Sequence, residues 1–293
     1  MGDDLKPTKP GDVLILLYHG VFPDGLDLQG RNSSGKHLPL SEFQRQMEIV
    51  KEKWAPVSML DIDSVYRRGK ELPERAIAIT FDDGYRNVYT TAWPILRDMK
   101  IPFTLYLTTG WLGTGEMSWV DKLEGMLLPE HPRTFAILRK VMKRLEFKEI
   151  ALALRDVESW IGRKFIPSPL YEMLSWEDVK IMAQSPFVTI GAHTVDHAPL
   201  ARVSIEEMKR QVRDSIGCIY QLYKKNPEVV PPLFSYPEGQ EEDFNEDSVF
   251  YLRNYGVEVC PTAIPGLNNV VTTLPMRLYR CAPGLGGQPF PLD

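Results

Sequence analysis

The chain has 293 residues, of which 43% are hydrophobic and 25% charged, an ordinary balance for a globular protein with one barrel-sized domain or two smaller ones. Its net charge of −5 disfavours a nucleic-acid partner and leaves no basic patch for a membrane surface. The three cysteines, Cys218, Cys260 and Cys281, are odd in number and form no CxxC pair, so they indicate neither a disulfide framework nor a thiolate metal site.

Short apolar runs alternate with amphipathic runs along the chain. This βαβα order favours a parallel sheet with helices outside, which can close into a barrel. The predicted strands are 13–17, 76–80, 103–107, 187–190, 233–236 and 257–262. The predicted helices are 41–54 with Ser41 as its cap, 61–68, 87–100 with a bend at Pro94, 204–224 opened by a capping box from Ser204 to Glu207, and 246–254.

Two adjacent carboxylates, Asp82 and Asp83, follow the predicted strand 76–80 directly, and Gly84 comes next. Adjacent side chains at the end of a strand diverge, so the two carboxylates can take different tasks. One can bind a metal ion while the other accepts a proton. A solvated turn is the alternative, because Asp and Gly are ordinary turn residues.

His193 and His197 are two of only five histidines in the chain, and they follow the predicted strand 187–190. Their spacing of four predicts two imidazoles on one face of a helical turn, which suits a single metal ion. Surface positions or a helix cap are the alternatives. Together with a strand-end Asp, they make three ligands and leave positions open for water and substrate, as catalytic metal sites do.

These motifs resemble those of a known family. TFDDG at 80–84 followed by HxxxH at 193–197 resembles the NodB-like polysaccharide deacetylases, or carbohydrate esterase family 4. LFSYPEG at 233–239 is similar to the third motif of that family. YHGV at 18–21 is similar to an element of the subgroup with circularly permuted motifs, as in the poly-N-acetylglucosamine deacetylases. The resemblance spans roughly residues 13 to 281.

The resemblance implies a distorted (β/α) barrel of about seven strands with its catalytic residues where the strands end. It also implies that Asp83, His193 and His197 hold a divalent metal, with zinc expected, although Ni²⁺, Co²⁺ or Fe²⁺ would accept the same ligands. Asp82 would be the general base, and the backbone N–H of Tyr236 would help to stabilise the oxyanion.

Two functions have shifted position relative to the unpermuted family. No histidine follows His197, so His19, at the position that the permuted subgroup uses, is the predicted general acid. A structural role beside the strand end is the alternative for His19. Ser235 stands where many members carry the Arg that orients the catalytic Asp, and Arg280 is the predicted replacement that pairs with Asp82.

We expect one domain over 1–293, with a helical insertion at about 110–175 and an extended or loosely packed tail at about 282–293. Residues 134–161 form the helical part of this insertion. Four tryptophans in or beside it either line a sugar groove or anchor a small core of the insertion. They are Trp111, Trp119, Trp160 and Trp176.

The remaining expectations concern the surface and the cellular location. His37 and His131 have no motif context and are expected to be surface residues. The first residues are polar and acidic, unlike a signal peptide or a membrane anchor, and predict a cytoplasmic location. A trimmed exported protein is the alternative. The sequence predicts no membrane span and leaves the oligomeric state open.

Taken together, the motifs predict a metal-dependent N-deacetylase whose partner is an N-acetylated sugar or glycan. Three alternatives compete with it. They are a deacetylase or deformylase of a small nucleotide- or lipid-linked sugar, a non-catalytic carbohydrate-binding protein on the same fold, and a Mg²⁺-dependent phosphotransfer enzyme. The lack of a Gly-rich phosphate loop disfavours the last of these.

Overall fold

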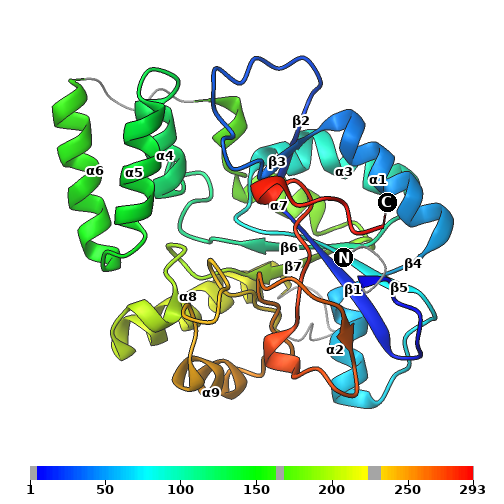
Figure 1. The fold of residues 1–293 in the computed structure, drawn as a ribbon. Helices are drawn as coiled ribbons and strands as arrows, with labels where there is room; N and C mark the ends of the chain where they lie inside the picture. Colours follow the sequence, from blue (N-terminus) through cyan, green and yellow to red (C-terminus); the bar gives the residue numbers. More distant parts are fainter. Residues whose placement is uncertain (1–4, 163–167, 224–231, 293) are drawn as a thin grey trace.

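The computed structural model describes residues 5–162, 168–223 and 232–292. Its central sheet contains, in spatial order, β7 (Val188–Ala192), β6 (Phe103–Leu107), β5 (Ala76–Phe81), β1 (Asp12–Tyr18) and β8 (Asn268–Asn269), with β4 (Ala55–Val57) also beside β5 (Figure 1). All pairs are parallel except β1 with β8. Every residue of β1 and β5 is buried, as expected for parallel strands covered on both faces. The predicted α/β class is confirmed.

Single backbone contacts continue this sheet beyond its regular strands. They join Ala192 to Phe234, Tyr236 to Pro261, Pro261 to Leu278, and Cys281 back to Leu16. The predicted strands 233–236 and 257–262 appear as isolated bridges with a few backbone hydrogen bonds and not as regular strands. Pro261 has no N–H to donate to a ladder, which interrupts the second of them. Apolar side chains from all these segments nevertheless meet in one cluster, which includes Ile15, Ala78, Tyr106, Leu233, Val259 and Leu278.

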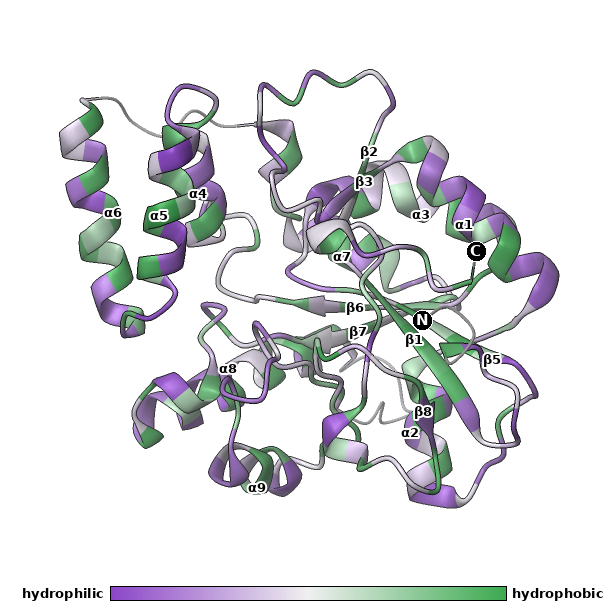
Figure 2. Cartoon of the chain, in the orientation of Figure 1, coloured by the Kyte–Doolittle hydropathy of each residue, from purple (hydrophilic) through white to green (hydrophobic). Residues whose placement is uncertain are grey.

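Helices surround the sheet, and their apolar faces pack on it (Figure 2). They are α1 (Leu40–Lys53), α2 (Met59–Arg68), α3 (Trp93–Met99), α7 (Trp176–Met182), α8 (Ile205–Tyr223) and α9 (Glu246–Asn254). Within the described residues, no helix combines the length and the apolar character that crossing a membrane requires. The last residue of the predicted helix 204–224 lies outside the described residues.

Several helix starts differ from the sequence prediction, and α2 begins at Met59, after Ser58 as its cap, and not at residue 61. α1 begins at Leu40 after Pro39, and Ser41 is not its cap; the Ser41 N–H instead donates to the Asp24 carboxylate at 3.1 Å. The predicted helix 87–100 divides into a π-helical turn, Val88–Ala92, and α3. Pro94 lacks the N–H for a regular helical bond, which explains why the turn widens just before it.

Three helices of the predicted insertion pack against one another (Figure 1). They are α4 (Trp119–Leu127), α5 (Pro132–Met142) and α6 (Phe147–Ile161). The predicted helical stretch 134–161 is therefore two helices, and the Glu149 carboxylate accepts the Glu146 N–H at 2.9 Å where the second begins. The helices share an apolar cluster of their own around Leu123, Phe135 and Val157. Residues 163–167 of the predicted insertion lie outside the described residues.

The C-terminal segment packs more closely than the sequence predicted. Phe290 and Leu292 are buried and belong to the main apolar cluster of the protein. Only a short 3₁₀ turn, Leu285–Gly287, precedes them. The segment that follows Arg280 is therefore fixed to the body of the protein near the carboxyl ends of β1 and β5.

Candidate active site

The turn after β5 directs its two carboxylates to different places. The Asp82 N–H donates to the Tyr18 carbonyl at 3.0 Å and so continues the pairing with β1. Asp83 and Gly84 then adopt left-handed backbone angles, with φ of 72° and 97°. This conformation is costly for Asp83 and easy for glycine. It turns the Asp83 side chain away from that of Asp82.

Asp83, His193 and His197 form one cluster at this edge of the sheet. One nitrogen or oxygen of each residue lies within 4.8 Å of the others. The Oδ1 atom of Asp83 is 3.6 Å from His193 Nε2 and 3.3 Å from His197 Nε2. The structure thus brings together the three residues that the sequence predicts as metal ligands.

The route by which the two imidazoles meet differs from the prediction. Residues 193–197 form a loop and not a helical turn, because Thr194 and His197 have left-handed φ angles of 62° and 59°. The Gln211 side chain, on α8, holds the loop by accepting the N–H groups of Val195 and Asp196 at 2.8 and 3.0 Å.

The cluster fits a divalent cation. Asp83 Oδ1 is buried and has no hydrogen-bond partner, an arrangement that is costly unless something else satisfies the oxygen. His193 Nδ1 lies 2.8 Å from the Ser235 carbonyl, which directs Nε2 toward Asp83, as partners of metal-binding imidazoles do. Burial lowers the pKa of His193 to about 4, so its imidazole is neutral at pH 7 and can bind a metal.

We expect that His193→Ala lowers the zinc content of the purified protein from about one ion per chain to near zero, because two ligands rarely retain zinc. Metal analysis by inductively coupled plasma mass spectrometry checks this. His131→Ala is the matched control, since His131 is exposed. Equal zinc content in both variants would contradict the assignment of this cluster as the metal site.

Asp82 is held by Arg280. The two carboxylate oxygens accept from the guanidinium at 2.9 and 2.6 Å, and the Ser235 hydroxyl lies 3.3 Å from one of them. Burial acts to raise the pKa of Asp82, but Arg280 and His193 outweigh it and hold that pKa below its ordinary value. Asp82 is therefore charged at neutral pH.

His19 and Tyr236 line the same cavity, of about 450 Å³, as Asp82, Asp83 and Arg280. Burial lowers the pKa of His19, while the two aspartates oppose this effect. The Tyr236 N–H, the predicted oxyanion donor, makes a long bond of 3.4 Å to the Pro261 carbonyl. The Tyr236 side chain stacks on Phe244 at 4.2 Å and lies away from the metal ligands.

Comparison with known proteins assigns the chain to a family. The family model described as polysaccharide deacetylase matches residues 69–260, more than half of the chain. The chain belongs to the polysaccharide deacetylase family. The match includes both Asp82 and the histidine pair, whereas His19 and Arg280 lie outside it.

Similarity to a curated relative covers more of the chain than the family model does. The poly-β-1,6-N-acetyl-D-glucosamine N-deacetylase of Escherichia coli K12 is 25% identical over 283 residues, which cover 96% of this chain. The chain spans about two fifths (38%) of the length of that relative.

Two solved structures share the fold. Streptococcus pyogenes deacetylase PplD, in complex with acetate, has a TM-score of 0.66 and 16% identity, covering 95% of this chain and 94% of that one. IcaB from Ammonifex degensii has a TM-score of 0.62 and 20% identity, covering 94% of this chain and 92% of that one. This likeness confirms the predicted fold.

The sequence analysis did not single out Lys36, a cation that lines the cavity containing Asp82. Lys36 lies at the cavity wall, with Nζ 2.6 Å from Asp121 and 2.5 Å from the Tyr85 hydroxyl. Asp121 belongs to α4 of the insertion, and the carboxylate of Glu124 on the same helix accepts the N–H groups of Asn32 and Ser33, both at 2.9 Å. The insertion therefore fixes the loop that carries Lys36, and no local sequence motif marks this contact.

The four tryptophans in or beside the insertion, expected either to line a sugar groove or to anchor a small core, have different environments. Trp111 stacks on the metal-site residue His197 at 5.5 Å, and Trp119 lines a cavity beside it. Trp176 packs against the main apolar cluster, while Trp160 is 63% exposed. Trp111 and Trp119 therefore border cavities beside His197, but Trp111 is also buried in an apolar cluster and Trp119 packs against the cluster of the insertion, so both alternatives remain open for this pair.

The histidines without motif context have different environments. His131 is exposed, as predicted. The prediction for His37 was wrong, because its side chain is buried. Its Nδ1 lies 3.0 Å from the Asn87 amide, and its ring packs edge-on against Tyr85 at 4.6 Å. The parallel pairing of β2 (Gly20–Phe22) with β3 (His37–Pro39) draws it inside.

Proposed function

We propose that this chain is a metal-dependent deacetylase that removes N-acetyl groups from an N-acetylated sugar or glycan. The single observation that carries the proposal is that the neighbouring carboxylates of Asp82 and Asp83 have different partners. Arg280 holds Asp82, while Asp83 faces two imidazoles, and all of them border one cavity. Membership of the polysaccharide deacetylase family and the names of its relatives support the same reaction.

The proposed ligands of the cation are Asp83, His193 and His197. A divalent cation bound there, zinc by preference with Ni²⁺, Co²⁺ or Fe²⁺ as alternatives, would supply a Lewis acid that polarises the acetyl carbonyl and makes water more acidic. His193 is already neutral, and the Ser235 carbonyl fixes its ring. Burial acts to lower the pKa of His197, but the neighbouring Asp83 carboxylate outweighs it and raises that pKa, so His197 would give up its proton when the cation binds.

In the proposed reaction, Asp82 accepts a proton from the attacking water. Its carboxylate is ionised and oriented by Arg280 before substrate arrives, so no reorganisation is needed at that step. The Tyr236 N–H would stabilise the developing oxyanion by exchanging its long bond to Pro261 for a shorter one. His19, in its protonated imidazolium form, would donate a proton to the departing amine nitrogen, which leaves acetate and a free amine as products. The proton that Asp82 takes from water returns to solvent, from which His19 is protonated again. Because burial lowers the pKa of His19, its protonated form is more populated as the pH falls.

The proposal is tested by acetate release from N-acetylglucosamine oligomers, N-acetylated sugar nucleotides and acetylated xylan, with zinc-loaded protein. Release from the first two groups supports an N-deacetylase and indicates whether it prefers a glycan or a small nucleotide-linked sugar. Release from xylan alone would indicate an esterase. No release from any of them, with zinc bound, would favour a non-catalytic carbohydrate-binding role.

We expect that His19→Gln lowers kcat on the amide substrate by about 10²-fold or more, the usual contribution of a positioned proton donor. On 4-nitrophenyl acetate, whose leaving group needs no proton, the same variant should lose little activity. Steady-state kinetics on both substrates check this. An equal loss on the two substrates would indicate that His19 is structural.

A further inference from the structure

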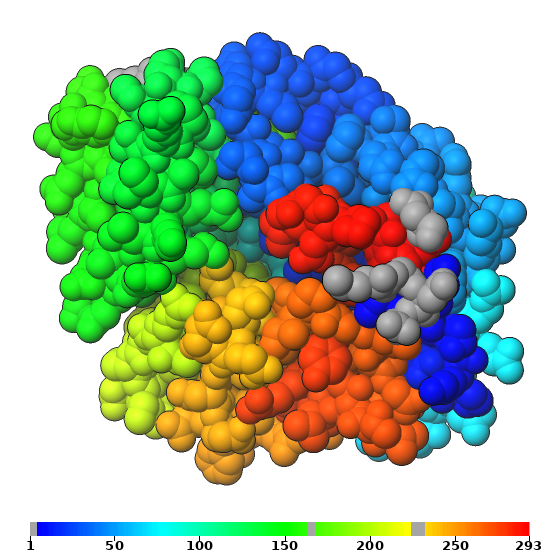
Figure 3. Space-filling view, viewed as in Figure 1, coloured from blue at the N-terminus to red at the C-terminus, as the bar shows by residue number. Residues whose placement is uncertain are grey.

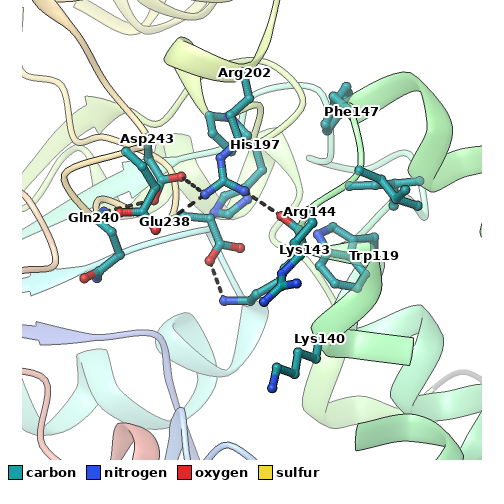
Figure 4. Close-up of a pocket in the computed structure, with 14 residues that line it drawn as sticks. Trp119, Lys140, Lys143, Arg144, Phe147, His197, Arg202, Glu238, Gln240 and Asp243 are labelled. Atoms are coloured by element: carbon teal, nitrogen blue, oxygen red, sulfur yellow. Dashed lines mark hydrogen bonds and ion pairs between the residues drawn. The ribbon is translucent and has the colours of Figure 1, made fainter. Parts of the chain in front are cut away.

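The candidate active site continues into a second cavity, of about 490 Å³ (Figure 4). This cavity lies between the end of α5 and the segments 197–202 and 238–243. It shares Lys143, His197, Glu238 and Gln240 with the cavity that contains Asp82. In the space-filling view, the green insertion lies next to the yellow segments that form the other side of this cavity (Figure 3). The metal ligands therefore lie within an extended cleft and not at the base of a closed pocket.

Two cations pair with the three acidic residues of this second cavity. Glu238 pairs with Lys143 at 2.9 Å, and Asp243 and Glu242 lie 2.7 and 3.8 Å from Arg202 (Figure 4). These pairs offset two of the three carboxylate charges, so one negative charge remains on that wall.

The opposite wall carries cations without partners. Lys140 and Arg144, at the C-terminal end of α5, have no ion pair or side-chain hydrogen bond with any residue that the structure describes. Arg139, the residue before Lys140, lines the cavity that contains Asp82. It too has no ion pair or side-chain hydrogen bond with any described residue. Cations at a helix end also interact favourably with its dipole, but that effect does not require them to line a cavity.

Flat apolar side chains accompany these cations. Trp119 and Phe147 line the same cavity, and Trp119 also borders a third cavity, of about 260 Å³, next to Trp111 and His197. Aromatic faces beside unpaired cations suit a sugar ring that carries a negative charge, because the ring can stack while the charge meets a guanidinium or ammonium group.

We propose that the substrate bears an anionic group, a phosphate or a carboxylate, on a part next to the N-acetylated sugar, and that Lys140 and Arg144 bind it. This inference rests on the proposed deacetylase function and specifies its substrate class. In a chain with a net charge of −5, an anion gains affinity only where local cations outnumber available acids, as they do on this wall.

The test measures binding to the zinc-loaded Asp82→Asn variant, which should not turn substrate over. Isothermal titration calorimetry compares three probes that contain N-acetylglucosamine. Chitotetraose is neutral, a hyaluronan tetrasaccharide carries carboxylates, and UDP-N-acetylglucosamine carries phosphates. We expect at least one anionic probe to bind about tenfold or more tightly than chitotetraose. Which one does so distinguishes a carboxylate from a phosphate.

Reversing the charge of Lys140 and Arg144 tests whether these residues cause the preference for an anionic probe. Lys140→Glu/Arg144→Glu should abolish it, whereas the matched pair Lys51→Glu/Lys53→Glu, exposed on α1, should retain it. Equal binding of neutral and anionic probes, no binding of any probe, or a preference that survives reversal at Lys140 and Arg144 would each overturn the inference.

Wild-type acetate release from chitotetraose is measured separately, so that the two proposals can fail independently. Release without an anion preference would leave the deacetylase proposal standing and overturn this one. An anion preference that depends on Lys140 and Arg144, without release from any N-acetylated probe, would support the anion site and contradict the deacetylase function.

Discussion

Replacing Asp82 by Asn is expected to lower kcat for acetate release by about 10²- to 10⁴-fold, while the zinc content stays unchanged. The amide keeps the shape of the side chain and its contact with Arg280, but it cannot accept the proton of water. Asp82 is not among the three residues whose ligand atoms cluster, so its loss should not release the metal. Steady-state kinetics and metal analysis on the same preparation check both parts.

Asp63→Asn is the matched control for this variant. Asp63 is also a buried aspartate held by an arginine, with Arg67 at 2.6 Å, but it lies on α2 away from the cavity. The control should retain kcat within about twofold even if it loses some stability. If Asp82→Asn also retained kcat, the proton would have to go elsewhere and the proposed role of Asp82 would be wrong.

Replacing Arg280 by Gln is expected to reduce the free energy of unfolding by about 3–5 kcal/mol, the usual cost of leaving one member of a buried ion pair without its partner. The Arg280 side chain is fully buried and also donates to the Thr262 carbonyl at 2.5 Å. Urea unfolding followed by circular dichroism measures the change. Arg67→Gln is the control, and we expect a smaller loss because the Arg67 side chain is 27% exposed.

The sign of the pH dependence follows from the pKa of Asp82. Without Arg280, burial raises this pKa above its unfolded value of about 3.9. The variant must then either bind an extra proton, which costs more as the pH rises, or keep a buried carboxylate unpaired, at a cost that does not depend on pH and is fully present above the raised pKa. The stability difference from wild type should therefore be larger at pH 7 than at pH 4.

A double variant separates the pair from the individual side chains. Asp82→Asn/Arg280→Gln removes both charges, so it should be more stable at pH 7 than Arg280→Gln alone. A double variant that is less stable than the single one, with simply additive losses, would indicate that Arg280 stabilises the protein through packing and not through Asp82.

Local sequence patterns predicted which three residues cluster, because Asp83 and the histidine pair closely follow strands. Asp83 comes after β5 and His193 after β7, and parallel strands place their carboxyl ends at one edge of a sheet. The helical geometry expected for the histidine pair was wrong, since spacing alone does not reveal the left-handed angles at Thr194 and His197. Those angles depend on Gln211, which is distant in the sequence.

Long-range contacts account for the other differences. Nothing near Lys36 in the sequence indicates that Asp121, 85 positions later, will pair with it. The burial of His37 depends in the same way on Asn87 and on the neighbouring strand β2. Arg280 could be anticipated only through family resemblance, because its partner lies 198 positions earlier.

The contact between the first strand and the last segment has a consequence for the order of folding. Leu16 and Cys281 bridge two segments that flank the site, and this closure brings Arg280 onto Asp82. Closing a loop of nearly the whole chain is entropically costlier than pairing β5, β6 and β7, so it should come later. The proposed cation ligands, Asp83, His193 and His197, all lie within or directly beside the strands that pair earlier. The contacts that gather the proposed cation ligands should therefore form before the one that places Arg280 on Asp82, so the two halves of the candidate site would be assembled in sequence.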